Sequence, residues 1–510
     1  MPKKKYVKLE KENIDYKKWI NIPLYNKKIS NNFSSNFLNH KHMLSLPHDW
    51  NNHEKDLLWL YNLHYFNDLN SSGNIENIEF HKSLLKNWIE NNKNIDDVGW
   101  DPYPLSIRIV NFIKIALTGH KFKNFVYDSF YSQSIALFAK LEKDILANHY
   151  FSNLKALFFA GNFYGNDEWT AFADKELLIQ IDEQVNEDGS NFELSPMYHG
   201  LFVIDLLEIL NLCQSMKNNQ YPELIKKCKQ IIPKMLNFLD AMSFSDDDIS
   251  FFNDSCNGIL PNISTIKLYA KKLGVLPKPH NQLIQDFPDS GFTVVKNKDV
   301  KLIFNCSNIE PRYQPGHNHA DTLSFELSFD KKRFLVNSGI SEYKYGKKRL
   351  FQRGTRSHST VEIDDMNSSE VWSSFRVGKR AKILAKSIYE KNEDIRLIAS
   401  HDGYSYLFKK TIHKRQLKLS NKKIVVKDNI NGTYKKAVAR FYFHPDTQII
   451  SRNDQLILRS NDKNIKVNTS SNEYQLKTSK WYPEFGVEVE NFVLEITFSS
   501  PENITVFAWD

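Results

Sequence analysis

The chain has 510 residues, too many for one ordinary hydrophobic core, so two or more domains are expected. A hydrophobic content of 41% and an aromatic content of 13% argue against disorder. The net charge of +8 is modest for this length, and the only dense basic run is the N-terminal PKKKYVK. We therefore expect no nucleic-acid partner, whereas a mildly basic chain is compatible with an anionic substrate.

The cysteines and the N-terminal segment indicate the cellular compartment that the protein occupies. Four scattered cysteines without a CxxC pair argue against a disulfide framework or a zinc–thiolate site and suit a reducing compartment. The basic N-terminal segment is not followed by the apolar stretch of a secretory signal, and no run of 18 or more apolar residues predicts a transmembrane helix. We expect a cytoplasmic protein, or a periplasmic one if an export signal has been removed. Nothing in the pattern indicates an oligomeric state.

The first half of the chain has a helical pattern. Apolar residues recur at three-to-four spacing in segments 80–92, 104–117, 129–146, 153–164, 201–216 and 221–242. Several of these segments are apolar on more than one face, which predicts helices buried on two sides. A succession of such helices indicates a toroid or a layered bundle.

The second half has a strand pattern. Short alternating runs occupy 291–297, 300–307, 322–329, 332–339, 359–364, 422–430, 437–445, 455–460 and 492–499, with turn residues between them and no alternating helices. This arrangement predicts an antiparallel sandwich rather than a doubly wound sheet. We place an N-terminal extension at 1–57, a helical domain at 58–285 and a β domain at 286–510, an α+β multidomain chain.

Two segments of the helical half carry residues that could do chemistry. Asn148 could cap a helix, and His149 could bond to backbone at the same helix start. Ser195 is a natural N-cap, followed by a first-turn proline and by Tyr198, whose phenol could project into a cleft or anchor the core. By residue type alone the structural interpretations are favoured.

The stretch PGHNHADTLSFELSF, residues 315–329, places His317, His319 and Asp321 two apart. On a regular strand these residues would share one face, but the alternation begins only at Thr322, so we expect a loop that delivers the histidines. With Asn337 and His358 they offer nitrogen and oxygen ligands for a metal, although HxH alone is a weak zinc signal.

Arginines follow in the same half of the chain, and other common motifs are missing. Arg349, Arg353 and Arg356 could clamp carboxylates or sulfates, or form a solvated loop. No Gly-rich phosphate loop, GxSxG elbow or HExxH motif occurs in the sequence. A glycoside hydrolase needs a carboxylate pair, and no candidate has an obvious partner; the candidates are Asp188, Glu193, Asp254 and Asp321.

Seven segments, taken in order, resemble the heparinase II/III-like polysaccharide lyase family, which includes heparin-sulfate lyases and oligoalginate lyases. They are WLYNLHYF, GWDPYPLSIRIVNFIK, NHYFSNLKALFFAG, DGSNFELSPMYH, FFNDSCNGILP, PGHNHADTLSFEL and RGTRSHSTVEIDDMNSSEVWSSFRVGKRA, from about residue 58 to 382. The resemblance implies an incomplete α/α toroid followed by an antiparallel β-sandwich, with an active site between them.

The resemblance also implies β-elimination beside a uronate, which requires carboxylate neutralisation, removal of the C5 proton and protonation of the leaving oxygen. Tyr198 matches the acid, which serves also as base when the geometry is syn. The other matching positions are Asn148 for neutralisation, His149 as base or second neutraliser, His317 lining the cleft, and Tyr343, with Tyr345 close by. Glu193 and Arg353 are expected to bind substrate.

His319 and His358 match two ligands of a structural zinc. The third position, usually aspartate, is Asn337, and a neutral amide is a poorer zinc ligand than a carboxylate. The site could use Asn337, recruit Asp321, or be empty. No organic cofactor is expected.

The leading hypothesis is a polysaccharide lyase acting on an anionic, uronate-containing glycan. The alternative is a non-catalytic glycan-binding or accessory protein of surface-polysaccharide biosynthesis, which the lack of an export signal motivates. Retention of Asn148, His149, Tyr198 and His317 argues against a pure scaffold.

Overall fold

The structure, a computed structural model, describes residues 13–277, 282–297, 299–329, 332–391, 394–406, 410–451 and 455–510. The chain forms two compact units. Unit 1 takes the described parts of Met1–Val185, Leu201–Leu236 and Pro261–Lys278, and unit 2 those of Asn186–Gly200, Asn237–Leu260 and Pro279–Asp510. Two short segments from the helical half therefore pack with the β half, an exchange that no sequence pattern indicates.

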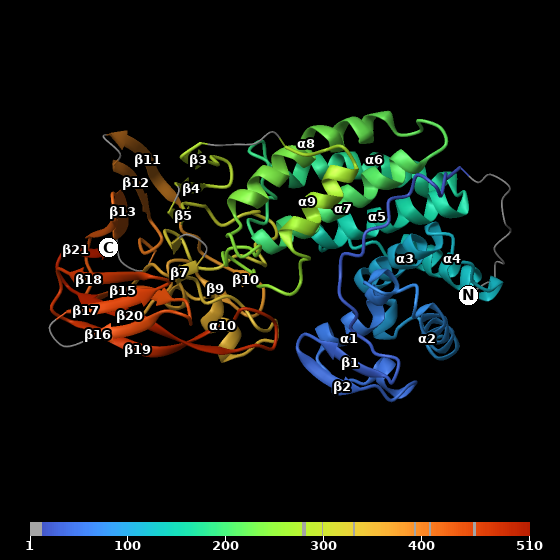
Figure 1. Ribbon diagram of the computed structural model, residues 1–510, viewed down its shortest axis with the longest axis horizontal. Coiled ribbons are helices and arrows are strands. Elements are labelled where there is room, and N and C mark those ends of the chain that lie inside the picture. The colour runs from blue at the N-terminus through green and yellow to red at the C-terminus, as the bar shows by residue number, and fades with distance from the viewer. Residues whose placement is uncertain are drawn as a thin grey trace. The chain divides into compact units, whose positions relative to one another are not determined.

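Unit 1 is built from helices, drawn blue to green in Figure 1. A hairpin of β1 (Ser34–Phe37) and β2 (His40–Met43) comes first. The helices are α1 (Leu57–Tyr65), α2 (Ile78–Asn91), α3 (Pro102–Leu117), α4 (Asn124–Ala139), α5 (Ala147–Tyr164), α6 (Asp167–Gln184), α7 (Pro196–Ser215), α8 (Pro222–Ala241) and α9 (Ile263–Lys272), of which α7 and α8 have one end in unit 2. Each of the six predicted helical segments contains a helix, but the helix in segment 129–146 ends at Ala139.

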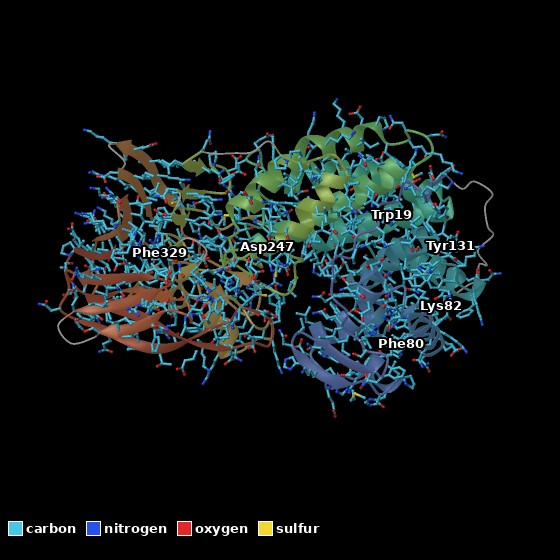
Figure 2. The ribbon with its side chains drawn as sticks, viewed as in Figure 1. Trp19, Phe80, Lys82, Tyr131, Asp247 and Phe329 are labelled. Carbon is cyan, nitrogen blue, oxygen red and sulfur yellow. The ribbon has the colours of Figure 1, made fainter. Side chains whose placement is uncertain are left out.

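The helical core explains why these segments are apolar on several faces. Fifteen residues of α5 are buried, including Phe151, Leu154 and Phe158, none of which is exposed. Each such side chain contributes about 2 kcal/mol when it leaves water. Trp19, labelled in Figure 2, meets Phe159 of the same helix edge to face, with ring centroids 6.2 Å apart. Helix α5 is thus surrounded by protein, as the pattern predicted.

Within the described residues, α7 is the one helix that meets the length and composition of a membrane span. Most of that window, 83%, is buried inside the protein, which is what a core helix shows.

Unit 2 contains two large antiparallel sheets, drawn yellow to red in Figure 1. The first runs β11 (Ile383–Lys391), β12 (Asp394–His401), β13 (Ile412–Ser420), β14 (Lys423–Asn431), β21 (Glu502–Trp509), β18 (Lys463–Thr469), β17 (Leu456–Ser460), β16 (Gln448–Ser451). The second runs β19 (Tyr474–Trp481), β20 (Val489–Phe498), β15 (Ala437–Phe443), β7 (Lys332–Val336), β6 (Phe325–Phe329), β5 (Val300–Asn305), β4 (Phe292–Lys296), β3 (Ile284–Asp286), with β8 (Val361–Ile363) paired to β15.

The two sheets share one apolar core, so the unit is a β-sandwich. Leu327 and Phe441 of the second sheet join Leu417 and Phe507 of the first in a single cluster of buried side chains. Phe329, labelled in Figure 2, lies at the end of β6 and packs on Trp509 with ring centroids 4.7 Å apart. The predicted fold class, an α/α toroid followed by an antiparallel sandwich, is confirmed.

A buried polar chain crosses the sandwich interior. His401 Nε2 lies 3.2 Å from His413 Nδ1, His413 Nε2 lies 2.8 Å from Asp428, and Arg415 pairs with the same carboxylate at 2.7 Å. The Gly403 N–H donates to His401 Nδ1, so His401 carries its proton on Nε2 and donates it to His413. Burial lowers the pKa of His401 well below 6.5 and lowers that of His413 as well. Both imidazoles are neutral in the folded protein.

These histidines make stability depend on pH. Below pH 6.5, the pKa of His401 in the unfolded chain, the unfolded chain binds a proton that His401 does not bind in the folded protein. The contribution to stability is therefore complete above pH 6.5 and is lost as the pH falls. His401→Gln removes one such site. Its unfolding free energy should fall less steeply between pH 6.5 and about 5, by ~1.4 kcal/mol per pH unit, in urea titrations. The same titration at pH 8 measures the packing cost alone, and equal slopes in both proteins would contradict this account.

Candidate active site

Asp254 is the centre of a buried polar cluster in unit 2. His317 Nδ1 lies 2.9 Å from one of its oxygens and His319 Nε2 lies 2.8 Å from the other. Arg349 pairs with both oxygens, at 2.5 and 2.7 Å. Burial alone raises the pKa of Asp254, but Arg349 and the two histidines outweigh it, so that the pKa lies well below its usual range. Asp254 is therefore an anion.

This anion fixes the tautomers of both histidines. An ionised carboxylate only accepts hydrogen bonds, so His317 Nδ1 and His319 Nε2 must each carry a proton. The remaining nitrogen of each ring, Nε2 of His317 and Nδ1 of His319, is the one that does not face the carboxylate. A carboxylate that orients a histidine in this way is a recurring support for proton transfer or ligand binding.

Two tyrosines lie against His317. The Tyr198 ring stacks on its imidazole, with centroids 3.8 Å apart and planes at 27°. The Tyr198 hydroxyl is 3.0 Å from that of Tyr343, and the Arg349 guanidinium lies over the Tyr343 ring, 5.0 Å from its centroid. Burial raises the pKa of Tyr343 well above 10, so this phenol stays protonated and can donate a hydrogen bond. The structure therefore brings together three of the five predicted catalytic residues.

Helix α7 positions Tyr198. The Ser195 hydroxyl accepts a hydrogen bond from the Tyr198 N–H and donates one to the Asp254 carbonyl, which confirms Ser195 as the N-cap. The residue before it, Leu194, has φ of 57°, and Asn253 has φ of 56°. Asparagine tolerates this left-handed region, whereas leucine does so only when its surroundings impose it, and such strain is common at functional sites.

Asn253 holds these segments together from its own left-handed position. Its amide nitrogen donates to the Leu194 carbonyl at 2.8 Å, and its amide oxygen accepts from the His319 N–H at 3.0 Å. The segment Phe251–Ser255 therefore contacts both the start of α7 and the histidine loop. That loop has no strand between Pro315 and Asp321, as predicted, and both of its histidines contact the carboxylate of Asp254.

Asn148 and His149 lie in unit 1, on the first turn of α5. The helix begins at Ala147 and its N-cap is Leu146, both with positive φ, so the predicted N-cap role of Asn148 is wrong. His149 Nδ1 is 2.9 Å from the Glu142 carboxylate, and its ring lies 4.6 Å from that of Tyr103. Unit 1 therefore repeats the arrangement seen at His317, a carboxylate on the Nδ1 of a partly exposed histidine.

Glu142 itself is fixed from two directions. Its side chain accepts from the Asn153 amide at 2.9 Å, while its N–H donates to the Asn153 oxygen at 2.8 Å. No sequence signal pointed to Glu142. The sequence indicates Asp254 only as a hydrolase carboxylate without an obvious partner, and Arg349 as a clamp for carboxylates or sulfates or as part of a solvated loop; in the structure Arg349 clamps the carboxylate of Asp254.

The predicted substrate contacts of Glu193 and Arg353 are not supported by their surroundings. Glu193 is 2% exposed, and Arg353 is fully buried. The Arg353 guanidinium donates to the Asn318 carbonyl and to three carbonyls of residues 372–376, and burial lowers its pKa to about 10. We therefore correct the role of Arg353 from a substrate clamp to a clamp on backbone.

The carboxylates considered for a hydrolase are also engaged. Asp188 accepts from the N–H groups of Ser190 and Ser290. Asp321 is buried, which raises its pKa to about 7, and it contacts the Asn253 backbone and the Asn305 side chain. With Asp254 held by Arg349, none of these groups forms the carboxylate pair that hydrolysis needs.

The predicted zinc ligands fit in part. His319 Nδ1 lies 3.3 Å from His358 Nε2, about the separation of two nitrogens on one tetrahedral zinc. The third position is the amide of Asn337, whose oxygen accepts from the Ser359 N–H. Among the described residues no group of three His, Cys, Asp or Glu side chains could hold a metal. The residues present thus supply two ligands of the three or four that a structural zinc requires.

Removing the charge of Asp254 should destabilise unit 2. Asp254→Asn leaves Arg349 buried without its counter-ion, which costs about 3–5 kcal/mol. We expect a correspondingly lower urea midpoint. Asp247→Asn, on a turn seven residues earlier (labelled in Figure 2), removes the same charge from a half-exposed side chain and should leave the midpoint nearly unchanged. Equal losses in both variants would refute the central role of Asp254.

The third zinc ligand can be tested directly. Asn337→Asp supplies the anionic oxygen that the His319–His358 pair lacks, and should raise zinc affinity by about ten-fold or more. The measurement is competition against a chromophoric chelator, with metal content as a second readout. Equal zinc affinity of the two proteins would show that residue 337 does not contribute to metal binding.

Comparison with known proteins identifies the family of this chain. The model of the heparinase II/III N-terminus matches residues 18–281, and that of the heparinase II/III-like C-terminal domain matches residues 279–510. A heparin-sulfate lyase of Pedobacter heparinus is 28% identical over 246 residues, 43% of this chain and 36% of that protein. A heparin-sulfate lyase of Bacteroides thetaiotaomicron is 24% identical over 411 residues, 70% of this chain and 55% of that protein. The chain thus spans about half the length, or less, of the curated relatives it matches.

Solved structures show the same fold. A crystal structure of heparinase III matches with a TM-score of 0.73 at 18% identity and covers 100% of this chain and 86% of that one. A chondroitinase AC lyase matches with a TM-score of 0.55 at 10% identity, over 88% of this chain and 75% of that one. With both family models matched in order over almost its whole length, this chain belongs to the heparinase II/III-like family.

Proposed function

We propose that this protein is a polysaccharide lyase that cleaves a uronate-containing anionic glycan by β-elimination. The observation that carries the proposal is the cluster of Tyr198, His317 and Tyr343, in which two phenol hydroxyls lie 3.0 Å apart beside an imidazole held on one side by Asp254. The relatives named heparin-sulfate lyases support a glycosaminoglycan as the first substrate to test.

The chemistry of elimination matches these groups. The C5 proton leaves, its electron pair forms the C4–C5 double bond, the C4–O4 bond breaks, and the departing oxygen takes up a proton. Tyr198 donates that proton, because it lies in the first turn of α7 and its hydroxyl is 3.0 Å from the hydroxyl of Tyr343 and close to His317. Tyr343, which stays protonated, stabilises Tyr198 whenever the latter carries negative charge.

His317 has the complementary role. Its Nδ1–H is committed to Asp254, which leaves Nε2 as the atom that accepts the C5 proton or, once protonated, holds the substrate carboxylate. Asn148 and His149 keep the roles that the family resemblance assigns, carboxylate neutralisation and support for the base. The Glu142 contact orients His149 for such a role as Asp254 orients His317.

The proposal predicts that incubation with heparan sulfate or another uronate polysaccharide produces the ultraviolet absorbance of an unsaturated uronate. Tyr198→Phe removes the transferable proton and should lower the initial rate at least about 100-fold. Reducing ends that appear without this chromophore would indicate hydrolysis. No product from a panel of acidic glycans that the protein nevertheless binds would favour the accessory, glycan-binding function.

A matched pair of variants separates the two neighbouring tyrosines. Tyr343 contacts Tyr198, whereas Tyr345 is 65% exposed. Tyr343→Phe should therefore lower kcat while Tyr345→Phe leaves it unchanged. The reverse result would move the second phenol of the site to residue 345.

A further inference from the structure

A short hairpin in unit 2 presents aromatic side chains to solvent. Strands β9 (Val371–Trp372) and β10 (Arg376–Val377) pair through Trp372 and Arg376 and through Val371 and Val377. Trp372 is 54% exposed and Phe375 is 39% exposed. We call residues 371–377 the aromatic hairpin. Two large exposed aromatic side chains on so short an element are a feature of binding surfaces.

The aromatic hairpin is fixed from beneath, unlike an ordinary surface loop. Arg349 donates twice to the Ser374 carbonyl, at 2.9 and 3.1 Å. Arg353 donates to the carbonyls of Trp372, Ser373 and Arg376 at 3.2 to 3.4 Å. Both guanidiniums are fully buried. A backbone held in this way presents its side chains already ordered, which reduces the entropy cost of binding a ligand.

The hairpin adjoins the proposed catalytic residues. The Phe375 ring lies 5.2 Å from that of Tyr343 and 5.9 Å from that of His317, centroid to centroid. A Cβ added at Gly316, the residue before His317, would lie 3.4 Å from Phe375 Cβ. A glycan that is bound beside Tyr198 and His317 therefore lies next to this hairpin.

Positive charge follows the aromatic side chains. Arg376, Lys379 and Lys382 are exposed and Arg380 is half-exposed, all within seven residues that contain no acid. Lys379 lies over the Tyr406 ring at 5.1 Å. Aromatic faces beside cations suit a ligand that has an apolar ring face and a negatively charged substituent, which is the combination that an acidic sugar offers.

We propose that the aromatic hairpin is a binding subsite for a pyranose ring of an anionic glycan, with Trp372 stacking on the ring and the basic residues at 376–382 holding its carboxylate or sulfate. The inference rests on the proposed function for the identity of the glycan. It extends that function to a second sugar of the glycan, next to the sugar whose bond is cleaved.

The test measures binding separately from cleavage. In the Tyr198→Phe background, affinity for end-labelled heparan sulfate oligosaccharides is measured for the parent, Trp372→Ala and Trp372→Phe. Trp372→Ala should weaken binding about ten-fold or more, and Trp372→Phe should retain most of it. Tyr389→Ala removes an aromatic side chain of similar exposure, 56%, from β11 of the same unit and should bind as the parent does. Thermal unfolding confirms that each variant is folded.

In the protein that retains Tyr198, Trp372→Ala should raise KM more than it lowers kcat. Desulfated oligosaccharides that keep the Trp372 dependence identify the carboxylate as the charged partner, and loss of dependence identifies sulfate; both agree with the subsite. The subsite is overturned if Trp372→Ala binds as tightly as the parent, or if Tyr389→Ala weakens binding equally. It is also overturned if the parent binds neither the sulfated nor the desulfated oligosaccharide. Binding that depends on Trp372 without any unsaturated product would sustain the subsite and reject the lyase activity.

Discussion

The ion pair between Arg349 and Asp254 is the interaction on which the rest of the site depends. Both side chains are fully buried, where unpaired charges are costly and even paired ones add little net stability. What the pair supplies is orientation, because the carboxylate can only accept hydrogen bonds and thereby sets the proton positions of His317 and His319. Tyr343 packs on the same guanidinium. The proton positions on both histidines therefore follow from one buried anion, Asp254.

Unit 1 contains a second histidine that is oriented by a carboxylate. Glu142 holds the Nδ1 of His149, and Asn153 holds Glu142. The supporting structure differs, because His149 is carried by the first turn of a buried helix whereas His317 is carried by a loop. The two sites share their chemistry: a partly exposed imidazole that has one nitrogen bonded to a carboxylate keeps the other nitrogen available to solvent or ligand.

The sequence predicted six of the helices and nine of the strands, but it missed others, among them α1, α6, α9, β11 to β13, β18, β19 and β21. Helix α6 and strands β11 to β13 carry many charged side chains on exposed faces, which dilute the apolar pattern. Of the site, the resemblance supplied Tyr198, His317 and Tyr343, whereas the role of Asp254 depends on contacts with residues 63 and 95 positions away. No local pattern encodes contacts at that separation. The N-cap role predicted for Asn148 is wrong because Leu146, two residues earlier, is the N-cap of α5 and has positive φ.

Arg353 shows why residue type alone misleads near such a site. A guanidinium offers five donors in a planar fork that suits sulfates and carboxylates, which is why it was expected to meet substrate. Burial directs those donors to carbonyls instead, one on the loop between the two histidines and three on the aromatic hairpin. The loop that carries His317 and the hairpin that carries Trp372 consequently share one rigid support. A glycan ring bound on the hairpin is then held at a fixed offset from the imidazole, since neither element can shift without breaking the hydrogen bonds of the same buried cation.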